Sequence, residues 1–464
     1  MSDPLWTARE VASATGGLAD GDFSATGITF DSREVQPGDL FVALQGVRDG
    51  HEFVQGAFAS GAVGALVSQP VSGGPFVLVP ETLKALEALG GQARDRAPQV
   101  RRGAVTGSVG KTSVTQAIRA GLDLAGPAHG SVKSFNNHIG VPLTLARMPR
   151  DVERAVFEIG MNHANEIGPL SRMVQPHAVC VTTVGPVHIE SFPDGEEGVA
   201  RAKAEIFEGL GPAGVAVLNG DDRWFDLLKQ AALERGARVA MFGSNPGGDA
   251  VLLDFRPDPE GADVRARIWG EEVSYRLAQP GFHWGPNSLA TLLMLEALDV
   301  PMATALEALA EFRPLAGRGA AKRVEIPGGA FLLIDESYNA NPISMKAGFR
   351  SLGARTDVMG RRIVALTDML ELGNHSEALH AGLADVLVEA EIDLVFTAGK
   401  AMQSLDRALP AEKRGGWAED ATALAPIVTA AVRPGDVVMV KGSNGSKASL
   451  VAKALAEMEA AREV

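Results

Sequence analysis

The most specific run in the sequence is Thr106-Gly107-Ser108-Val109-Gly110-Lys111-Thr112. An apolar run over residues 103–105 precedes it, and a helix is expected to follow over residues 113–124. Glycines at such a strand–helix junction let backbone N–H groups turn toward phosphate oxygens, and the helix N-terminus adds positive potential. Lys111 can then bridge the β- and γ-phosphates of a nucleotide, and Thr112 can hold Mg²⁺. The stretch therefore predicts a phosphate-binding loop.

The same loop has a simpler alternative interpretation. Val105 stands where the full G-x-x-x-x-G-K-[ST] motif has its first glycine. An ordinary strand–helix turn with a surface lysine would also account for the residues. The strand, the glycines, the Lys-Thr pair and the helix together favour phosphate binding.

Outward from this loop, short apolar runs alternate with helix-like stretches along nearly all of the 464 residues. This alternation is typical of α/β units with parallel sheets, and at about 150 residues per domain the length predicts three domains. Breaks at residues 98–102 and 314–319 place an N-terminal α/β domain at 1–101, a central domain at 102–314 and a C-terminal domain at 315–464. We expect a P-loop ATPase-like parallel sheet in the central domain and a Rossmann-like α/β fold in the C-terminal one.

The expected elements follow from the apolar patterns. Helices are predicted over residues 53–61, 81–97, 113–124, 286–298, 302–312 and 447–461. Strands are predicted over residues 63–67, 103–106, 155–159, 178–184, 215–218, 331–334, 363–366, 394–396 and 437–440. Alternation over residues 262–269 and 272–277, around Gly270, predicts an antiparallel hairpin at the sheet edge.

Composition narrows the class of protein. The net charge of -14 argues against nucleic acid as a partner. No stretch approaches the roughly 20 apolar residues of a membrane span, and the N-terminus lacks the pattern of a secretory signal. The single cysteine, Cys180, lies in an apolar run and is interpreted as a buried thiol. We therefore expect a cytoplasmic protein.

A second group of candidate residues is Glu158, His188 and Lys203. Glu158 ends an apolar run, where side chains reach the ligand crevice of an α/β sheet, and His188 follows the next run. Mg²⁺ prefers a few carboxylates with waters and substrate oxygens, so both are candidate metal or phosphate-site residues. From the pattern alone, Lys203 is interpreted as a solvated helix lysine, and Glu158 is equally consistent with a structural role.

Three further polar runs mark loops. In Asp31-Ser32-Arg33, Arg33 could hold a diphosphate, although a turn before a strand explains the run equally well. Asp335-Glu336-Ser337-Tyr338-Asn339-Ala340-Asn341-Pro342 follows a strand and is either a ligand site or a helix cap. The run at 441–447 could bind an anion, but its pattern favours a tight turn.

Taken together, these runs resemble the Mur ligase family, the amide-forming ligases of peptidoglycan synthesis. The resemblance covers essentially the whole chain. It is carried by the phosphate loop, by Phe135-Asn136-Asn137-His138-Ile139-Gly140-Val141-Pro142, by the runs at 158–163 and 202–207, by the run at 335–342 and by Asp368-Met369-Leu370-Glu371-Leu372-Gly373. The last two are most similar to the member that adds D-alanyl-D-alanine.

The resemblance implies a reaction and its ligands. ATP would activate the carboxylate of a UDP-N-acetylmuramoyl-tripeptide as an acyl phosphate, and D-alanyl-D-alanine would displace the phosphate, a step in cell-wall growth, shape and division. The rivals are a sister ligase that adds a single amino acid and a non-catalytic nucleotide-binding protein. A monomer is expected.

The resemblance also implies roles for individual residues. Thr112 and Glu158 match the positions of one Mg²⁺, and His188 and Lys203 match a second Mg²⁺ site at which the lysine is carbamylated. The N-terminal domain matches a UDP-binding domain, with Ser32 and Arg33 at its UDP site. The nucleotide-contact positions, in addition to the phosphate loop at 106–112, match Asn137, Asn287, Arg318, Asp335 and Asn339. Catalysis would rest on Lys111, Glu158, His188 and Lys203.

Three positions depart from the family pattern. Val109 replaces a frequent Asn in the phosphate loop, and Trp284 follows His283 where Asn is usual. Asn444 stands where Arg is common in the loop at 441–447.

Overall fold

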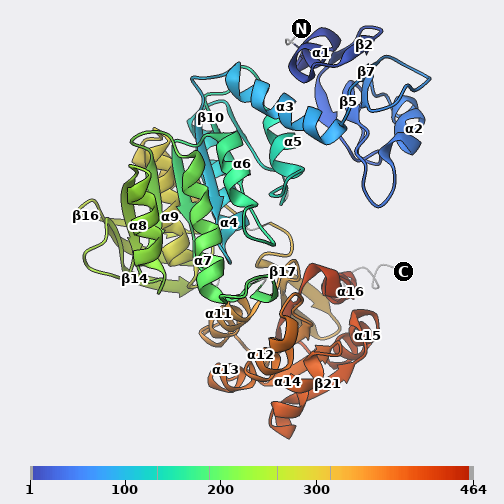
Figure 1. The fold of residues 1–464 in the computed structure, drawn as a ribbon. Helices are drawn as coiled ribbons and strands as arrows, with labels where there is room; N and C mark the ends of the chain where they lie inside the picture. The colour runs from blue at the N-terminus through green and yellow to red at the C-terminus, as the bar shows by residue number, and fades with distance from the viewer. Residues whose placement is uncertain (1–3, 133, 188, 259, 314, 459–464) are drawn as a thin grey trace.

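The chain folds into three α/β domains, as predicted (Figure 1). The computed structural model describes residues 4–132, 134–187, 189–258, 260–313 and 315–458. Its three principal sheets contain five, nine and six strands and follow one another along the chain. Within the described residues, none of the helices has the length and apolar character that a membrane crossing requires.

The N-terminal domain is built on a five-stranded sheet with strand order β2-β7-β6-β5-β4. Only the β2–β7 pair is antiparallel. The strands of this sheet are β2 (Leu18–Asp20), β4 (Gly27–Thr29), β5 (Asp39–Val42), β6 (Gly64–Val67) and β7 (Phe76–Leu78). A small ribbon pairs β1 (Trp6–Thr7) with β3 (Ser24–Ala25). The helices are α1 (Ala8–Thr15), α2 (Val54–Ala59) and α3 (Thr82–Asp95).

This domain is fastened to the central domain by hydrogen bonds at α3 and α5 (Gly140–Ala146). The Trp6 indole N–H donates to the Ala146 carbonyl at 2.8 Å. The Arg96 guanidinium stacks on the Trp6 ring and donates to the Leu5 and Met148 carbonyls. Since these partners come from both sides of the junction, the joint is specified by directional contacts as well as by apolar packing.

The central domain is built on a nine-stranded sheet with strand order β16-β15-β14-β13-β12-β11-β8-β10-β9. The pairs from β14 through β9 are parallel, and β14, β15 and β16 form an antiparallel edge. The strands are β8 (Arg101–Thr106), β9 (Ala128–Gly130), β10 (Arg154–Glu158), β11 (Ala178–Val181), β12 (Val215–Asn219), β13 (Arg238–Gly243), β14 (Ala250–Asp258), β15 (Gly261–Ile268) and β16 (Glu271–Leu277).

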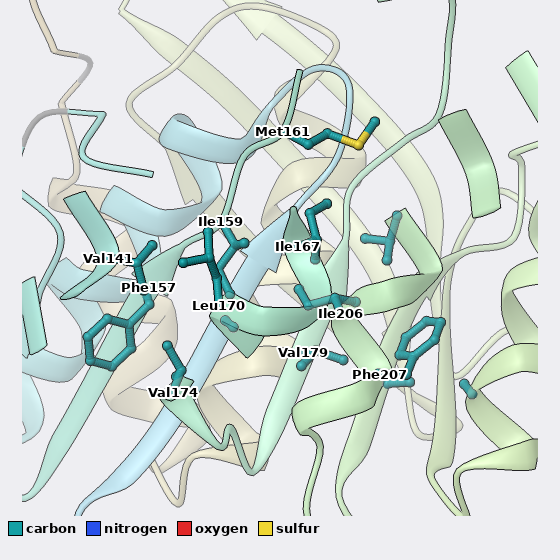
Figure 2. Packing of buried hydrophobic residues seen from close by; sticks show 14 of the residues in the cluster. Val141, Phe157, Ile159, Met161, Ile167, Leu170, Val174, Val179, Ile206 and Phe207 are labelled. Carbon is teal, nitrogen blue, oxygen red and sulfur yellow. The ribbon is translucent and has the colours of Figure 1, made fainter. Parts of the chain in front are cut away.

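Helices cover both faces of this sheet. On one face the apolar core includes residues of α5, α6 (Ile167–Val174), α7 (Glu196–Ala204) and α8 (Phe225–Glu234). On the other it includes residues of α4 (Lys111–Ala125), α9 (Trp284–Ala297) and α10 (Met302–Glu311). Figure 2 shows the first core, with Phe157 of β10 beside Val141 of α5 and with Leu170 and Val174 of α6. A strand covered on both faces reads as a continuous apolar run, which is why these strands were predictable.

The C-terminal domain has a six-stranded sheet with strand order β17-β18-β22-β19-β20-β21, antiparallel only between β17 and β18. The strands are β17 (Ala320–Ile326), β18 (Gly329–Glu336), β19 (Arg362–Thr367), β20 (Leu394–Ala398), β21 (Arg414–Ala418) and β22 (Val437–Lys441). The helices are α11 (Pro342–Gly353), α12 (Ser376–Ala381), α13 (Ala384–Glu389), α14 (Met402–Ala408), α15 (Ala421–Ala431) and α16 (Ser449–Ala456).

Most predicted elements are present with altered ends. The hairpin is β15–β16, and its turn places Trp269 and Gly270 at positive φ. The helix predicted over 113–124 begins earlier, at Lys111, because the phosphate loop leads directly into it. The helix predicted over 447–461 begins later, at Ser449, since Lys447 adopts a left-handed conformation; it ends at Ala456, and residues 459–461 of the predicted range lie outside the described residues.

Truncation of Phe157 to Ala should destabilise the central domain by about 3–5 kcal/mol, because the ring is fully buried and its removal leaves a cavity. Leu233→Ala on α8 is the matched control, since that side chain is exposed and its loss should change stability by less than about 0.5 kcal/mol. Denaturant unfolding of the two variants measures the difference. Equal stabilities would contradict the packing described here.

Candidate active site

A cavity of about 490 Å³ lies between the central and C-terminal domains. It is lined by residues at the carboxyl ends of the central strands and of β18 and β22, where open α/β sheets bind ligands. In Figure 1 this junction lies between the central domain, which carries the α7 label, and the C-terminal domain, which carries the α11 label. The polar residues that line it include Ser108, Lys111, Thr112, Ser134, Asn136, Asn137, Glu158, Thr182, Thr183, Asn219, His283, Asn287, Arg318, Glu336, Tyr338, Asn339, Asn341, Ser344 and Lys441.

The phosphate loop forms one wall of the cavity. Gly107 and Gly110 have φ values of +146° and +87°, which β-carbon-bearing residues rarely adopt. A β-carbon at Gly107 would also lie 1.9 Å from Thr182 Oγ1. The Lys111 ammonium donates to the Gly107 carbonyl at 2.6 Å, so the lysine curls back over its own loop. Val109, the first departure from the family pattern, accepts a hydrogen bond from Thr182 through its backbone carbonyl.

A neighbouring loop after β11 holds the phosphate loop in place. Ser108 N–H donates to the Thr183 carbonyl at 2.7 Å, and Gly185 N–H donates to Ser108 Oγ at 3.0 Å. The Asp222 carboxylate in turn accepts from Thr183 Oγ1 at 3.0 Å and from Val184 N–H at 2.6 Å. Asp222 therefore positions the phosphate loop through an intervening segment and does not line the cavity itself.

Glu158 ends β10 inside the cavity and is only 1% exposed. Its Oε1 accepts from the Asn136 amide at 2.6 Å. Its Oε2 is buried and has no hydrogen-bond partner among the described residues. A buried acceptor without a donor is costly, so this oxygen is suited to a cation that enters with a ligand.

Lys203 lies near the end of α7 and is 3% exposed. Burial, and then repulsion from Lys111, hold the pKa of its amine well below that of an exposed lysine. Among the described residues, none accepts a hydrogen bond or forms an ion pair with it. The interpretation of Lys203 as a solvated helix lysine, made from the pattern alone, is therefore wrong, because α7 turns this residue into the interior.

Arg318 enters the cavity from the linker between the two domains. Its guanidinium lies 4.3 Å from the centre of the Tyr338 ring and donates to Ser134 Oγ at 3.1 Å. Ser134 Oγ is also 3.4 Å from Thr112 Oγ1. Burial lowers the pKa of Arg318, while Glu158 acts to raise it. Linker, phosphate loop and C-terminal domain thus meet at one point.

The C-terminal wall carries a buried ion pair. Lys441 Nζ donates to Glu336 Oε2 at 2.7 Å and to the Asn339 carbonyl at 3.1 Å. Burial alone would raise the pKa of Glu336, but Lys441 and His283 outweigh it and hold that pKa below its usual value. The predicted Asp335 does not line the cavity; its Oδ1 accepts from Ser337 N–H, and its neighbour Glu336 lines the cavity instead.

The other predicted residues are placed as follows. Asn137 and Asn287 line the cavity, and Asn137 Oδ1 also accepts from Ile139 and Gly140 N–H at the start of α5. Thr106 and Gly107 do not line it, although they begin the loop that does. His188 lies outside the described residues. The other two departures from the family pattern lie elsewhere: Trp284 is buried against Phe312, and Asn444 is exposed.

Ser32 and Arg33 belong to the N-terminal domain and do not line the cavity. The Arg33 side chain is 86% exposed and forms a two-point contact with the Asp31 carboxylate at 2.9 and 2.6 Å.

The residues that the sequence analysis missed include five that line the cavity, together with Asp222, which positions the phosphate loop. Asn136 stands in the quoted run at 135–142, and Glu336 and Asn341 stand in the run at 335–342, so their motifs were found but their individual roles were not. Thr182, Thr183 and Asp222 carry no local motif, and only the strand order brings them to the phosphate loop.

Comparison with known proteins decides the family. Residues 105–295 match the "Mur ligase middle domain", residues 322–444 match "Mur ligase, glutamate ligase domain", and residues 24–89 match "Mur ligase family, catalytic domain". The chain belongs to the Mur ligase family. The UDP-N-acetylmuramoyl-tripeptide–D-alanyl-D-alanine ligase of Escherichia coli (strain K12) is 33% identical over 455 residues, which cover 95% of this chain and 96% of that protein.

Solved Mur ligase structures share the whole fold. The structure of MurF from Acinetobacter baumannii superposes with a TM-score of 0.84 at 28% identity and covers 97% of this chain and 99% of that one. The MurF ligase of Thermotoga maritima in complex with ADP gives a TM-score of 0.77 at 23% identity, over 94% of this chain and 98% of that one. This second likeness supports the fold alone.

Asp222→Asn should lower kcat/KM for ATP by about tenfold or more. The Asp222 carboxylate accepts from Val184 N–H with one oxygen and from Trp224 N–H with the other, whereas an amide has only one oxygen to accept with. Loss of one such contact costs about 1.4 kcal/mol, which corresponds to a tenfold change in rate. Asp221→Asn is the matched control, since its carboxylate binds Ser244 instead. Steady-state kinetics with varied ATP measures the effect. The positioning role is wrong if the two variants have equal kcat/KM values.

Proposed function

We propose that this Mur ligase joins D-alanyl-D-alanine to UDP-N-acetylmuramoyl-tripeptide in an ATP-dependent, amide-forming step of peptidoglycan synthesis. The observation that carries the proposal is the near full-length match to a ligase of that name. The cavity supports it independently, because it sets a phosphate loop opposite a C-terminal domain that can carry a second substrate. The cytoplasmic location and the monomeric state stay predictions.

The reaction has two steps. A carboxylate oxygen of the tripeptide attacks the γ-phosphorus of ATP, and the bond to the bridging oxygen breaks, giving an acyl phosphate and ADP. The dipeptide amine then attacks the acyl carbon, phosphate leaves, and the amine nitrogen loses a proton. Because carboxylate and triphosphate are both anionic, the first step needs positive charge around the transferring group.

Lys111 and Arg318 supply positive charge from this chain. Lys111 leaves the Gly107 carbonyl and binds the β- and γ-phosphates, and burial strengthens its interaction with them. Arg318 reaches the same region from the linker, so its position depends on how the two domains meet. Thr106–Thr112 cradle the phosphates, and Asn137, Asn287 and Asn339 contact the nucleotide. We assign to Glu336 the nucleotide contact that the resemblance placed at Asp335.

The residues present fit a divalent cation. Thr112 and Glu158 would hold one Mg²⁺, and the unpartnered Glu158 Oε2 is the observation that supports it. The described residues contain no group of three His, Cys, Asp or Glu suited to a metal, which agrees with an ion that takes phosphate oxygens and waters as its remaining ligands. Bound Mg²⁺ neutralises charge on the transferring phosphoryl group.

Lys203 fits a second site only in modified form. A carbamate forms when the neutral amine attacks CO₂ and loses a proton, and burial lowers the pKa of the Lys203 amine, which favours its neutral form. The product is an anionic oxygen ligand, which hard Mg²⁺ prefers, and it would offset the positive charge of Lys111. His188 completes this second Mg²⁺ site in the proposal.

The UDP moiety binds in the N-terminal domain at Ser32 and Arg33. The Arg33 guanidinium is exposed and holds only a surface carboxylate, so a diphosphate can take over its two-point contact.

A phosphate-release assay tests the function. With UDP-N-acetylmuramoyl-tripeptide and ATP, phosphate should appear when D-alanyl-D-alanine is added and not with single amino acids such as L-lysine or D-glutamate. Lys111→Ala should abolish release while the protein stays folded by circular dichroism. Turnover with a single amino acid would indicate a sister ligase, and the lack of any turnover would indicate a non-catalytic nucleotide-binding protein.

Lys203→Ala should be nearly inactive, and a short carboxylic acid added to the assay should partly restore turnover by supplying the missing oxygen ligand. Lys203→Arg should stay inactive with or without the acid, because a guanidinium keeps positive charge where an anion is needed. Arg201→Ala, on the exposed side of the same helix, is the matched control. An active Lys203→Arg enzyme would rule out the carbamate.

A further inference from the structure

We propose that Asn341 and the N-terminus of α11 form a phosphoryl-binding site on the C-terminal domain, where the Asn341 amide donates to the group that ATP transfers. This inference rests on the proposed function, because it adds a phosphoryl contact on the wall of the cavity that faces the phosphate loop. α11 has 12 residues, and its amino end faces the cavity through Asn341, Ile343 and Ser344.

The orientation of the Asn341 amide is set by the helix. Asn341 Oδ1 accepts from Ser344 N–H at 2.9 Å, and Asn341 N–H donates to Ser344 Oγ at 3.1 Å, which is a reciprocal cap. Exchanging the amide oxygen and nitrogen would bring two donors together at Ser344. Nδ2 must therefore point away from the helix backbone, and the amide is fixed as a hydrogen-bond donor toward its other side.

That donor has nothing to bind. Asn341 is 3% exposed, and its Nδ2 is buried without a partner in the described part of the chain. Among the described residues that line the cavity, one other has an unpartnered buried side-chain atom, and that atom is the acceptor Glu158 Oε2. One wall of the cavity thus presents an acceptor without a donor, and the other presents a donor without an acceptor. A cation and an anionic oxygen that bind together would satisfy both atoms. The helix N-terminus adds positive potential to the second wall.

The position of this donor favours a phosphoryl oxygen. A β-carbon built at Gly185 would lie 2.0 Å from Ile343 Cδ1, so the first turn of α11 packs directly on that glycine. Gly185 N–H in turn donates to Ser108 Oγ of the phosphate loop. The N-terminus of α11 and the phosphate loop are therefore separated by a single residue, and a terminal phosphate held by the loop would face Asn341.

A carboxylate of the incoming dipeptide has the same hydrogen-bonding chemistry and is the alternative source of the oxygen. ATP and ADP separate the two, since only ATP carries the γ-phosphate. The contact predicts weaker binding of a non-hydrolysable ATP analogue and unchanged binding of ADP when the donor is removed. A dipeptide contact predicts no change for either nucleotide.

Asn341→Asp is the decisive variant. Asp caps a helix as well as Asn does, so the cap to Ser344 and the thermal unfolding midpoint should be retained. The substitution replaces the donor with an anionic acceptor. We expect affinity for the ATP analogue with Mg²⁺ and kcat/KM for ATP to fall by at least about 10- to 150-fold, the range for a hydrogen bond to a charged group. Asn341→Ser also retains a capping side chain but introduces no charge. Its loss of ATP-analogue affinity and of kcat/KM for ATP should lie within that range.

Asp420→Asn is the matched control, because Asp420 caps α15 of the same domain by accepting from Ala423 N–H and does not line the cavity. Its kinetics and nucleotide binding should equal those of the unmodified enzyme. Normal ATP-analogue binding by a folded Asn341→Asp variant would overturn the site, as would a rise confined to the KM for the dipeptide. Nucleotide binding is measured without the other substrates. It therefore tests the Asn341 site even if the protein does not ligate the dipeptide.

Discussion

Two lysine side chains within electrostatic reach of each other, Lys111 and Lys203, set the main constraint on this molecule. Burial lowers the pKa of both, and the charge of Lys111 lowers that of Lys203 further. Desolvation of unpaired charge is costly, so an arrangement of this kind is retained where ligands compensate it. In the proposed function, phosphates compensate the charge of Lys111, and a carbamylated, anionic Lys203 compensates the remainder. The protein alone is thus electrostatically incomplete at its centre.

The rest of the structure serves to bring complementary groups to this centre. The parallel strands β8, β10 and β11 end at the same edge of the central sheet, which places the phosphate loop, Glu158 and Thr182 together. β18 and β22 deliver Glu336 and Lys441 from the C-terminal domain. The linker connects these two sets of residues. Tyr338 N–H donates to the carbonyl of Gly317, and the next residue along the chain is Arg318. By contrast, the N-terminal domain is fixed through Trp6 and Arg96, away from the cavity.

Much of this arrangement could be predicted from the sequence, and the exceptions have physical causes. Strands buried on both faces, such as β8 and β10, read as apolar runs, and the phosphate loop has a local motif. Local pattern could not show that α7 turns Lys203 inward, since one lysine among alternating charged and small residues looks solvated. Nor could it separate Asp335 from Glu336, because adjacent residues at a strand end face opposite sides. Asp222 acts on residues that are distant in the sequence, and Asn341 was identified by a buried N–H group without a partner. Both features depend on the three-dimensional structure and leave no local pattern.

Carbon-13 NMR in labelled bicarbonate distinguishes a carbamylated, anionic Lys203 from a bare amine. The enzyme saturated with Mg²⁺ and a non-hydrolysable ATP analogue should show one carbamate carbon resonance that is absent from Lys203→Arg and retained in Lys111→Ala. A spectrum of the unmodified, fully loaded enzyme without that resonance would show that Lys203 remains a bare amine and would rule out its proposed role as an anionic metal ligand.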